Sequence, residues 1–152
     1  MDLKILLNAI PFEIERSFCK HVNKILKRRP SSKPFLSGDT FREFADVLYD
    51  ETYKCKAEEI KEGSIVFVSS WLLESFITDV LPKIENKFIL LTHQGDVNIV
   101  QKKEYIQLAE NENVIHWFAQ NCTLEHKKVT PLPIGLEDAK LFNAGHLRDI
   151  KK

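Results

Sequence analysis

The chain has 152 residues, 43% of them hydrophobic, which is enough for one ordinary domain with a sizeable core. Its 22 basic and 22 acidic side chains give a net charge of zero, which argues against a dedicated nucleic-acid-binding protein. No apolar run approaches the ~20 residues that span a bilayer, and three scattered cysteines without a C-x-x-C pair indicate a reduced, cytoplasmic setting.

The N-terminal part of the chain is predicted to contain one strand and one helix. Leu3–Leu7 is a short apolar run typical of a strand. Phe12–Arg29 has apolar residues at helical spacing, with acidic residues in its first turn and basic residues in its last, as the helix dipole favours. An amphipathic helix is therefore expected there, followed by a loop that begins at Pro30.

A short strand and a second helix are expected next. Pro34–Leu36 has the apolar character of a strand and ends at the polar residues Ser37-Gly38-Asp39. Thr40 opens a capping-box pattern, so a helix is predicted to begin at this residue. The apolar residues that this helix is expected to bury are Phe44, Val47 and Leu48. The polar stretch 50–62 shows no clear pattern.

The middle of the chain shows a clearer strand followed by a helix. Ser64–Val68 is β-branched and apolar, as strands often are. Ser70 is a candidate N-cap for a helix whose wide apolar stripe suits packing against a sheet. The stripe consists of Leu72, Leu73, Phe76, Ile77, Val80, Leu81 and Ile84.

The remaining elements complete an alternating pattern. Phe88–Leu91 is continuously apolar, which indicates a strand covered on both faces, as in a parallel sheet. A helix is expected around Lys103–Ala109 and a strand at Val114–Phe118, while the two prolines within Val129–Ile134 predict an irregular or edge strand. The whole chain, 1–152, is thus predicted to be a single Rossmann-like α/β domain. Its open, mostly parallel, twisted sheet is expected to have five or six strands and helices on both faces.

Several motifs that would name a reaction are missing from the sequence. With five glycines it contains neither G-x-G-x-x-G nor the P-loop pattern, so the usual dinucleotide and P-loop phosphate sites are not indicated. It has no H-E-x-x-H, no D-x-D and no G-x-S-x-G. No cofactor and no metal are therefore predicted.

Polar residues follow the predicted strands, where open α/β sheets bind their ligands. The clearest cluster is Thr92–Asp96, directly after the apolar run of Phe88–Leu91. Within it His93 and Asp96 are candidates for acid–base chemistry, because a histidine titrates near neutrality and a carboxylate can orient it. The structural alternative is that His93 caps a loop and Asp96 begins a turn with Gly95.

Other polar and aromatic candidates have equally simple structural alternatives. Asp39 is either a base or a carboxylate that favours the N-terminus of the next helix. Gln120, Asn121 and Glu137 suit a ligand with many hydroxyl groups, but an amide or a carboxylate in such a loop also satisfies backbone groups or caps a helix. Trp71 and Trp117 are suited to stack on a sugar or a base, although core packing is the more common fate of such residues.

Three segments, taken in order, resemble the N-terminal half of exostosin-like glycosyltransferases, which have two Rossmann-type (GT-B) domains. They are Leu90-Leu91-Thr92-His93-Gln94-Gly95-Asp96-Val97-Asn98, Trp117-Phe118-Ala119-Gln120-Asn121 and Pro131-Leu132-Pro133-Ile134-Gly135-Leu136-Glu137. The upstream stretches 35–39 and 64–84 fit the same layout, so the resemblance covers about residues 35 to 140.

The resemblance implies transfer of a sugar from a nucleotide-sugar donor to a hydroxyl of a carbohydrate acceptor. Carried onto this chain, it implies that His93 or Asp96 deprotonates the acceptor. The residues expected to line the acceptor side are Asp39, Gln94, Asn121 and Glu137. The chain ends where a second Rossmann-type half would begin, so the expectation is either a domain cut from a longer enzyme or a short form that lacks the donor site. In both cases the isolated chain should bind an acceptor weakly at best and catalyse nothing.

Two other functions fit the sequence. A non-catalytic α/β ligand-binding or interaction module explains the core, the neutral charge and the missing cofactor motifs without any lost half. If a second half is missing instead, the face that it leaves exposed would suit a homodimer. A small hydrolase with Ser37 or Ser69 as nucleophile ranks last, because the chain lacks a nucleophile-elbow motif.

Overall fold

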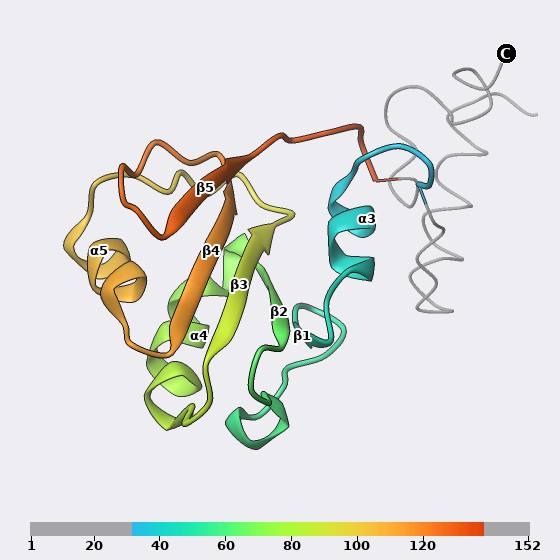
Figure 1. Cartoon of the computed structure of the whole chain (residues 1–152). Coiled ribbons are helices and arrows are strands. Elements are labelled where there is room, and N and C mark those ends of the chain that lie inside the picture. Colours follow the sequence, from blue (N-terminus) through green and yellow to red (C-terminus); the bar gives the residue numbers. More distant parts are fainter. Residues whose placement is uncertain (1–31, 139–152) are drawn as a thin grey trace, which may run out of the picture.

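The computed structural model describes residues 32–138, which form a parallel sheet of five strands (Figure 1). The strands lie side by side in chain order, β1-β2-β3-β4-β5, and every neighbouring pair is parallel. Their bounds are β1 Val47–Tyr49, β2 Ile65–Ser69, β3 Phe88–His93, β4 Val114–Gln120 and β5 Val129–Leu132. The prediction of an open, parallel, Rossmann-like α/β sheet is confirmed.

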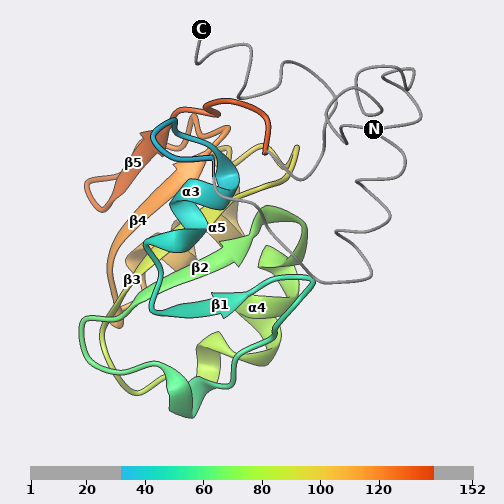
Figure 2. The same cartoon turned by 90° about the vertical axis from the view of Figure 1, so that its right-hand side faces the viewer.

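The order of the strands decides which face the helices cover. Because consecutive strands are neighbours and crossover connections keep one hand, the connections all lie on one face of the sheet. Helices α4 (Leu73–Asp79) and α5 (Lys103–Glu110) cover that face. Helix α3 (Gly38–Glu43) comes before β1 and packs on the opposite face, as the two views in Figures 1 and 2 show.

The main core lies between the sheet and helices α4 and α5. Phe76 of α4 is fully buried, and its ring packs edge-on against Tyr49 and Phe88, with centroids 5.4 and 6.3 Å away. Trp117 of β4 packs against Tyr105 of α5 at 6.0 Å. Its buried indole N–H is satisfied, because it donates to the Thr92 hydroxyl over 2.9 Å.

The opposite face has a much smaller core. Phe41 of α3 packs on Phe67 and Leu91, and the partly buried Phe118 and Leu132 border this cluster. Since α3 has only six residues, it covers a limited part of the sheet. The two layers therefore differ strongly in size.

The predicted helix at Thr40 is wrong in position and length. Ser37 caps the helix instead, its hydroxyl accepting the Thr40 N–H, and the helix ends at Glu43. Val47 and Leu48 belong to strand β1, because pairing with Val66 and Phe67 of β2 satisfies their backbone groups. Phe44, expected to be buried, is 58% exposed.

Two further expectations are corrected. Residues 34–36 lie in a turn and the loop after it rather than in a strand. Among the described residues, the strand-like pairing nearby is an isolated bridge between Ser37 and Leu136. The helix expected after Ser70 is divided into three short pieces, η2 (Ser70–Leu72), α4 and η3 (Leu81–Lys83), with a proline inside the last. Ser70 does not cap it, because its hydroxyl donates to the His93 carbonyl.

Other predicted elements agree with the structure or lie outside it. Strands β2 to β5 and helix α5 form within two residues of their expected bounds, and the stripe on α4 and η3 is largely buried. A further 3-10 turn, η1 (Ala57–Glu59), lies in the stretch without a clear pattern. The strand at Leu3–Leu7 and the helix at Phe12–Arg29 fall outside the described residues.

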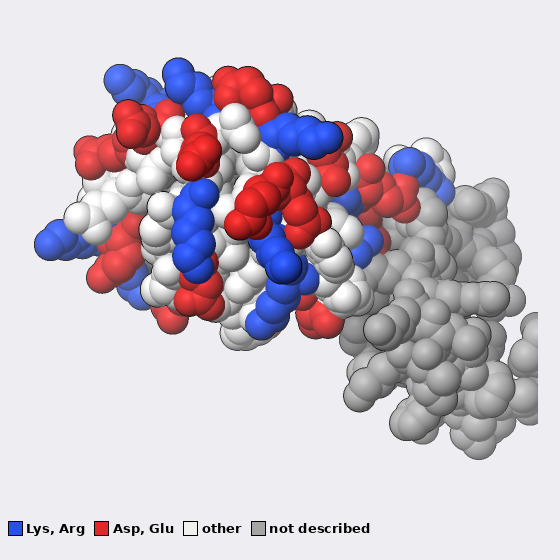
Figure 3. All heavy atoms as spheres, turned by 90° about the horizontal axis from the view of Figure 1, so that it is seen from below, with Lys and Arg blue, Asp and Glu red and all other residues white. Residues whose placement is uncertain are grey.

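The surface of the described part carries charges of both signs. Figure 3 looks onto the amino ends of the strands, where acidic and basic side chains are interspersed rather than gathered into a basic stripe. Within residues 32–138, no helix has the length and apolar character needed to cross a membrane.

Candidate functional site

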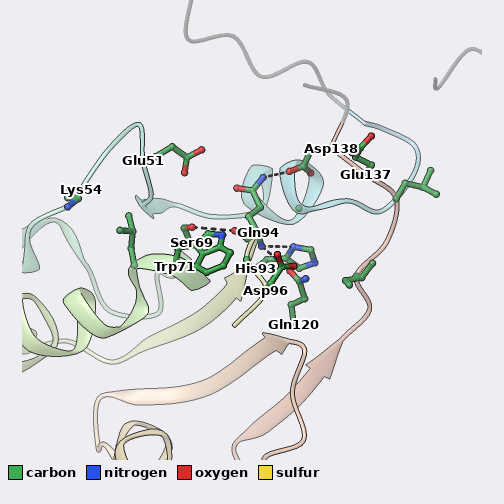
Figure 4. A pocket seen from close by; sticks show the side chains of 15 residues that line it. Glu51, Lys54, Ser69, Trp71, His93, Gln94, Asp96, Gln120, Glu137 and Asp138 are labelled. Carbon is green, nitrogen blue, oxygen red and sulfur yellow. Dashed lines mark hydrogen bonds between the residues drawn. The ribbon is translucent and has the colours of Figure 1, made fainter. Parts of the chain in front are cut away.

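A cleft of about 1000 Å³ opens at the carboxyl ends of the strands (Figure 4). Its lining comes from the ends of β2, β3 and β4, from the loop after β1, from Gly38 and from the segment 134–138 after β5. This segment crosses toward α3, where the Leu136 N–H donates to the Leu36 carbonyl over 2.8 Å. The cleft thus opens at the carboxyl edge of the sheet, the edge at which the sequence predicts a ligand site.

The parallel register brings three polar side chains together on the floor of this cleft. Ser69 is the register partner of His93, and Gln120 of β4 lies one strand further along. All three are buried and line the cleft. The backbone N–H of Gln94 donates to the Gln120 side-chain carbonyl over 2.9 Å, which ties the end of β3 to the end of β4.

His93 is 3% exposed, and backbone groups engage both of its ring nitrogens. Nδ1 accepts the Gln94 N–H over 2.9 Å, so Nε2 carries the proton and donates it to the Pro133 carbonyl over 3.2 Å. Burial lowers the pKa of His93, and the Pro133 carbonyl and the Asp138 carboxylate oppose that shift only in part. The ring is therefore neutral near pH 7 and links β3 to the segment after β5.

Gln94 joins three distant segments of the chain. Its side-chain NH₂ donates to Asp39 and to Asp138, both over 2.7 Å, and the Asp39 backbone N–H donates to the other Asp138 oxygen over 2.7 Å. The backbone of Gln94 is left-handed, with φ 60°, a conformation that costs free energy for a residue other than glycine. Such strain is typical of functional sites, where the surrounding contacts hold it in place.

The close fit around Gln94 explains one glycine. A Cβ atom on Gly38 would lie 2.4 Å from Gln94 Cγ, 3.0 Å from His93 Nδ1 and 3.1 Å from Asp138 Oδ1. Any larger residue at this position would push the bridging amide away from its two carboxylates.

The structure separates the predicted site residues into three groups. Asp39, His93 and Gln94 come together in the network described above. Asp96 and Glu137 line the cleft, and Asp96 is exposed, with no hydrogen bond to His93. Asn121 does not line it: with φ 50°, it donates its side-chain N–H to the Gly95 carbonyl over 3.3 Å and holds the loop after β3.

Sequence reasoning missed Asp138 and misjudged Trp71. Asp138 is 8% exposed and reaches Asp39 across 99 positions of sequence, a partnership that no local pattern signals. Core packing was preferred for both tryptophans; this is right for Trp117 but wrong for Trp71, which is 64% exposed and lines the cleft. Its place directly after the strand end at Ser69 was the available signal.

The residues of the cleft do not gather into a metal site. Within residues 32–138, no group of three or more histidine, cysteine, aspartate and glutamate side chains is arranged to hold a metal ion. What the cleft offers instead is hydrogen-bonding chemistry: amide, hydroxyl and carboxylate groups beside one exposed indole.

Comparison of the chain with protein-family models, with curated proteins and with solved structures gives no match to any of them. The function is therefore argued from the geometry of the cleft.

Proposed function

We propose that this chain is a glycosyltransferase-like domain whose cleft binds a carbohydrate acceptor. The observation that carries the proposal is the cleft at the carboxyl edge of a parallel sheet, lined by amides, carboxylates and a hydroxyl. This is where open α/β folds bind ligands, and these groups donate and accept hydrogen bonds as a polyhydroxylated molecule requires. The resemblance of three segments to exostosin-like enzymes supports the same class.

Gln120 supplies the most direct contact for such a ligand. Its side-chain carbonyl is occupied by the Gln94 N–H, while its NH₂ group makes no hydrogen bond with the described residues. The side chain lines the cleft (Figure 4). Its NH₂ group is thus available to a ligand hydroxyl.

Of the two acid–base candidates, the geometry favours Asp96 as the base. Both nitrogens of His93 are engaged by backbone groups, whereas the Asp96 carboxylate is exposed at the cleft. In the proposed reaction the acceptor hydroxyl gives its proton to Asp96 as its oxygen bonds to the anomeric carbon. As that bond forms, the bond from the anomeric carbon to the nucleoside diphosphate breaks, and the diphosphate leaves with the bonding electrons. A second domain would hold the donor, so the chain alone should transfer no sugar.

A binding module without catalysis is the second candidate. It is favoured by the state of His93, which is buried, neutral and fixed at both nitrogens, as a structural histidine would be. On this alternative the cleft binds a ligand, and Asp96 has no chemical role.

Calorimetric titration of the chain with neutral oligosaccharides and with nucleotide sugars tests the proposal. Oligosaccharide binding is expected, and Gln120→Glu should weaken it, because the glutamate keeps the acceptor for the Gln94 N–H but loses the donor. Asp79→Asn, at the end of α4 and outside the cleft lining, is the matched control and should bind as wild type does. Failure of every oligosaccharide to bind would contradict the carbohydrate assignment.

A further variant, Asp96→Asn, separates the two candidates. The enzyme would be established if adding a donor-binding domain to the chain gives sugar transfer. In addition, Asp96→Asn must abolish this transfer while it still binds the acceptor. Acceptor binding with wild-type transfer in Asp96→Asn would remove Asp96 from the chemistry.

A further inference from the structure

Trp71 is the largest apolar side chain that the cleft presents to solvent. It lies in the turn η2 directly after β2, lines the cleft and is 64% exposed, whereas Trp117 is fully buried. An indole left in water forgoes a large gain from burial, because aromatic side chains bury 150–250 Å² each when they pack. Exposure of this kind at a concave site marks a place where a ligand supplies the missing contact.

The ring is held by its neighbours rather than hanging from a loose loop. A Cβ atom on Gly95 would lie 3.2 Å from Trp71 Cδ1, 3.2 Å from the Trp71 backbone nitrogen and 2.9 Å from Ser70 Cβ. The loop after β3 therefore packs directly against the indole edge. The Ser70 hydroxyl also anchors the turn, because it donates to the His93 carbonyl over 3.2 Å. A ring bordered along one edge in this way has fewer conformations to lose when a ligand binds.

The lining of the cleft has an apolar part and a polar part. Leu72, Ile134 and Leu136 join Trp71 as its apolar members, and Ile134 and Leu136 are 57% and 39% exposed. Ser69 and Gln120 are polar and come from the strand ends below. A pyranose ring has the same division, since its faces carry C–H groups while its edges carry hydroxyls.

The charges of the lining argue against a phosphorylated ligand. Lys54 is the only basic side chain among the described residues that line the cleft, while four carboxylates line it: Glu51, Asp96, Glu137 and Asp138. Phosphate groups are bound in proteins by arginine, lysine and backbone N–H groups. The described lining therefore suits a neutral ring better than a nucleotide.

We propose that Trp71 forms a stacking subsite for one pyranose ring of a neutral saccharide, and that Gly95 positions its indole. This inference rests on the proposed function and deepens it by naming the ligand class and the residue that selects it. Specificity follows from shape: sugars whose ring face carries several axial C–H groups stack best, and charged sugars gain least.

The two tryptophans of the chain allow a direct test. The probes are cellohexaose, maltohexaose, N-acetylchitohexaose and UDP, each titrated into the whole chain while acrylamide quenching of fluorescence is followed. Acrylamide should quench the fluorescence of Trp71 and leave that of the buried Trp117 unquenched. At saturation, at least one of the three hexasaccharides is expected to lower the quenching constant about twofold or more, because the quenching comes from Trp71 and the stacked sugar covers its exposed face. UDP is expected to change nothing.

Three substitutions then identify the contact. Trp71→Ala should weaken saccharide affinity roughly tenfold or more, and Trp71→Phe should retain most of it, because a ring of smaller area still stacks. Trp71→Leu separates stacking from simple apolar contact and should resemble the alanine variant. Each variant should unfold at nearly the wild-type urea concentration, because the side chain is exposed.

The outcomes separate this inference from the proposed function. Saccharide binding of wild-type strength in Trp71→Ala would overturn the subsite and leave the carbohydrate cleft standing. If UDP protects Trp71 and no saccharide does, the subsite stacks a nucleotide base, and both the saccharide subsite and the carbohydrate cleft would be overturned. If none of the four probes changes the quenching of Trp71 from its value without ligand, both the stacking subsite and the carbohydrate cleft would be overturned.

Discussion

The layer between the sheet and helices α4 and α5 and the cleft at the carboxyl edge are held together in different ways. In the layer, apolar side chains such as Phe76 and Trp117 pack with almost no exposure. In the cleft, Gln94 and His93 connect the end of β3 to Asp138 and Pro133 through hydrogen bonds. The first kind of contact is non-directional and tolerant of small shifts, whereas the second depends on geometry within tenths of an ångström.

This difference assigns stability and function to separate parts of the molecule. Apolar burial gives most of the free energy of folding. Buried polar groups cost free energy unless every partner is in place, so a network such as Asp39–Gln94–Asp138 adds less to stability than apolar burial does. Under the proposed function, its role is to shape the cleft for a ligand. Substitutions in the layer should therefore change folding, and substitutions at the cleft should change ligand binding with smaller effects on folding.

The largest effect is expected from Phe76→Ala. The ring is fully buried between Tyr49 and Phe88, and its removal should lower the free energy of unfolding by about 3–5 kcal/mol. Urea denaturation measures this loss. Phe44→Ala is the matched control, because Phe44 is 58% exposed and its loss should cost under about 0.5 kcal/mol. Equal losses in the two variants would contradict the division between core and surface.

Asp50 tests an ionic contact between the end of strand β1 and helix α3. Burial alone would raise its pKa, but hydrogen bonds from Thr52 and Arg42 outweigh burial and lower the pKa from 3.8 to about 2. The Arg42 Nε lies 2.6 Å from the carboxylate. Because the folded-state pKa is depressed, the contribution is complete above about pH 4 and is lost as the pH falls through about 2.

The size of this contribution is about 2 kcal/mol, at 1.36 kcal/mol for each unit of pKa. Free energies of unfolding of wild type and Asp50→Asn should therefore differ most above pH 5 and converge by about this amount toward pH 2. A difference that is constant with pH would show that the carboxylate charge is not what stabilises the fold.

Gly38→Ala disturbs the cleft directly. The new Cβ atom would meet Gln94 Cγ at 2.4 Å, so the bridging amide must move away from Asp39 and Asp138. Since the side chain can shift, the cost should be about 1–2 kcal/mol, toward the lower end of overpacking, but ligand binding should be lost. Gly63→Ala is the control: its φ of 77° strains the backbone although nothing lies within 4 Å. It should cost stability without affecting binding.

The smallest effect concerns His93. Because burial lowers its folded-state pKa, the unfolded chain binds the proton more readily once the pH drops below about 6.5. Stability should therefore fall as the pH decreases from about 6.5 toward the folded-state pKa. In His93→Gln, whose amide can still donate to Pro133, this part of the pH dependence should disappear. An unchanged pH profile would show that His93 is not buried as a neutral ring.

Local sequence patterns were enough to predict the elements whose burial is continuous. Phe88–Leu91 has no polar residue and forms part of the central strand β3. A continuously apolar run of this length is by itself typical of a strand that is buried on both faces. Val47 and Leu48 misled the prediction, since their spacing from Phe44 is also that of a helix. Pairing with β2, a contact distant in sequence, decided their conformation.

The position of the candidate site was predictable from the sequence, but its hydrogen-bond partners were not. Strand ends of a parallel sheet meet at one edge, which locates His93 and Gln94 from the sequence alone. The partners of Gln94 are a different matter, because Asp39 and Asp138 come from segments 55 and 44 residues away in opposite directions. The exposure of Trp71 likewise depends on tertiary packing, which no apolar pattern around it records.

The chain-order arrangement of the strands has a consequence for synthesis on the ribosome. Each strand pairs with the one made just before it, so the sheet can grow while the nascent chain is still emerging. The network at the cleft cannot, because Asp39 must wait for Asp138, 99 positions later. We therefore expect a nascent chain arrested after β5 to hold a paired sheet with an unassembled cleft, so that the proposed ligand would bind only after Asp138 has been made.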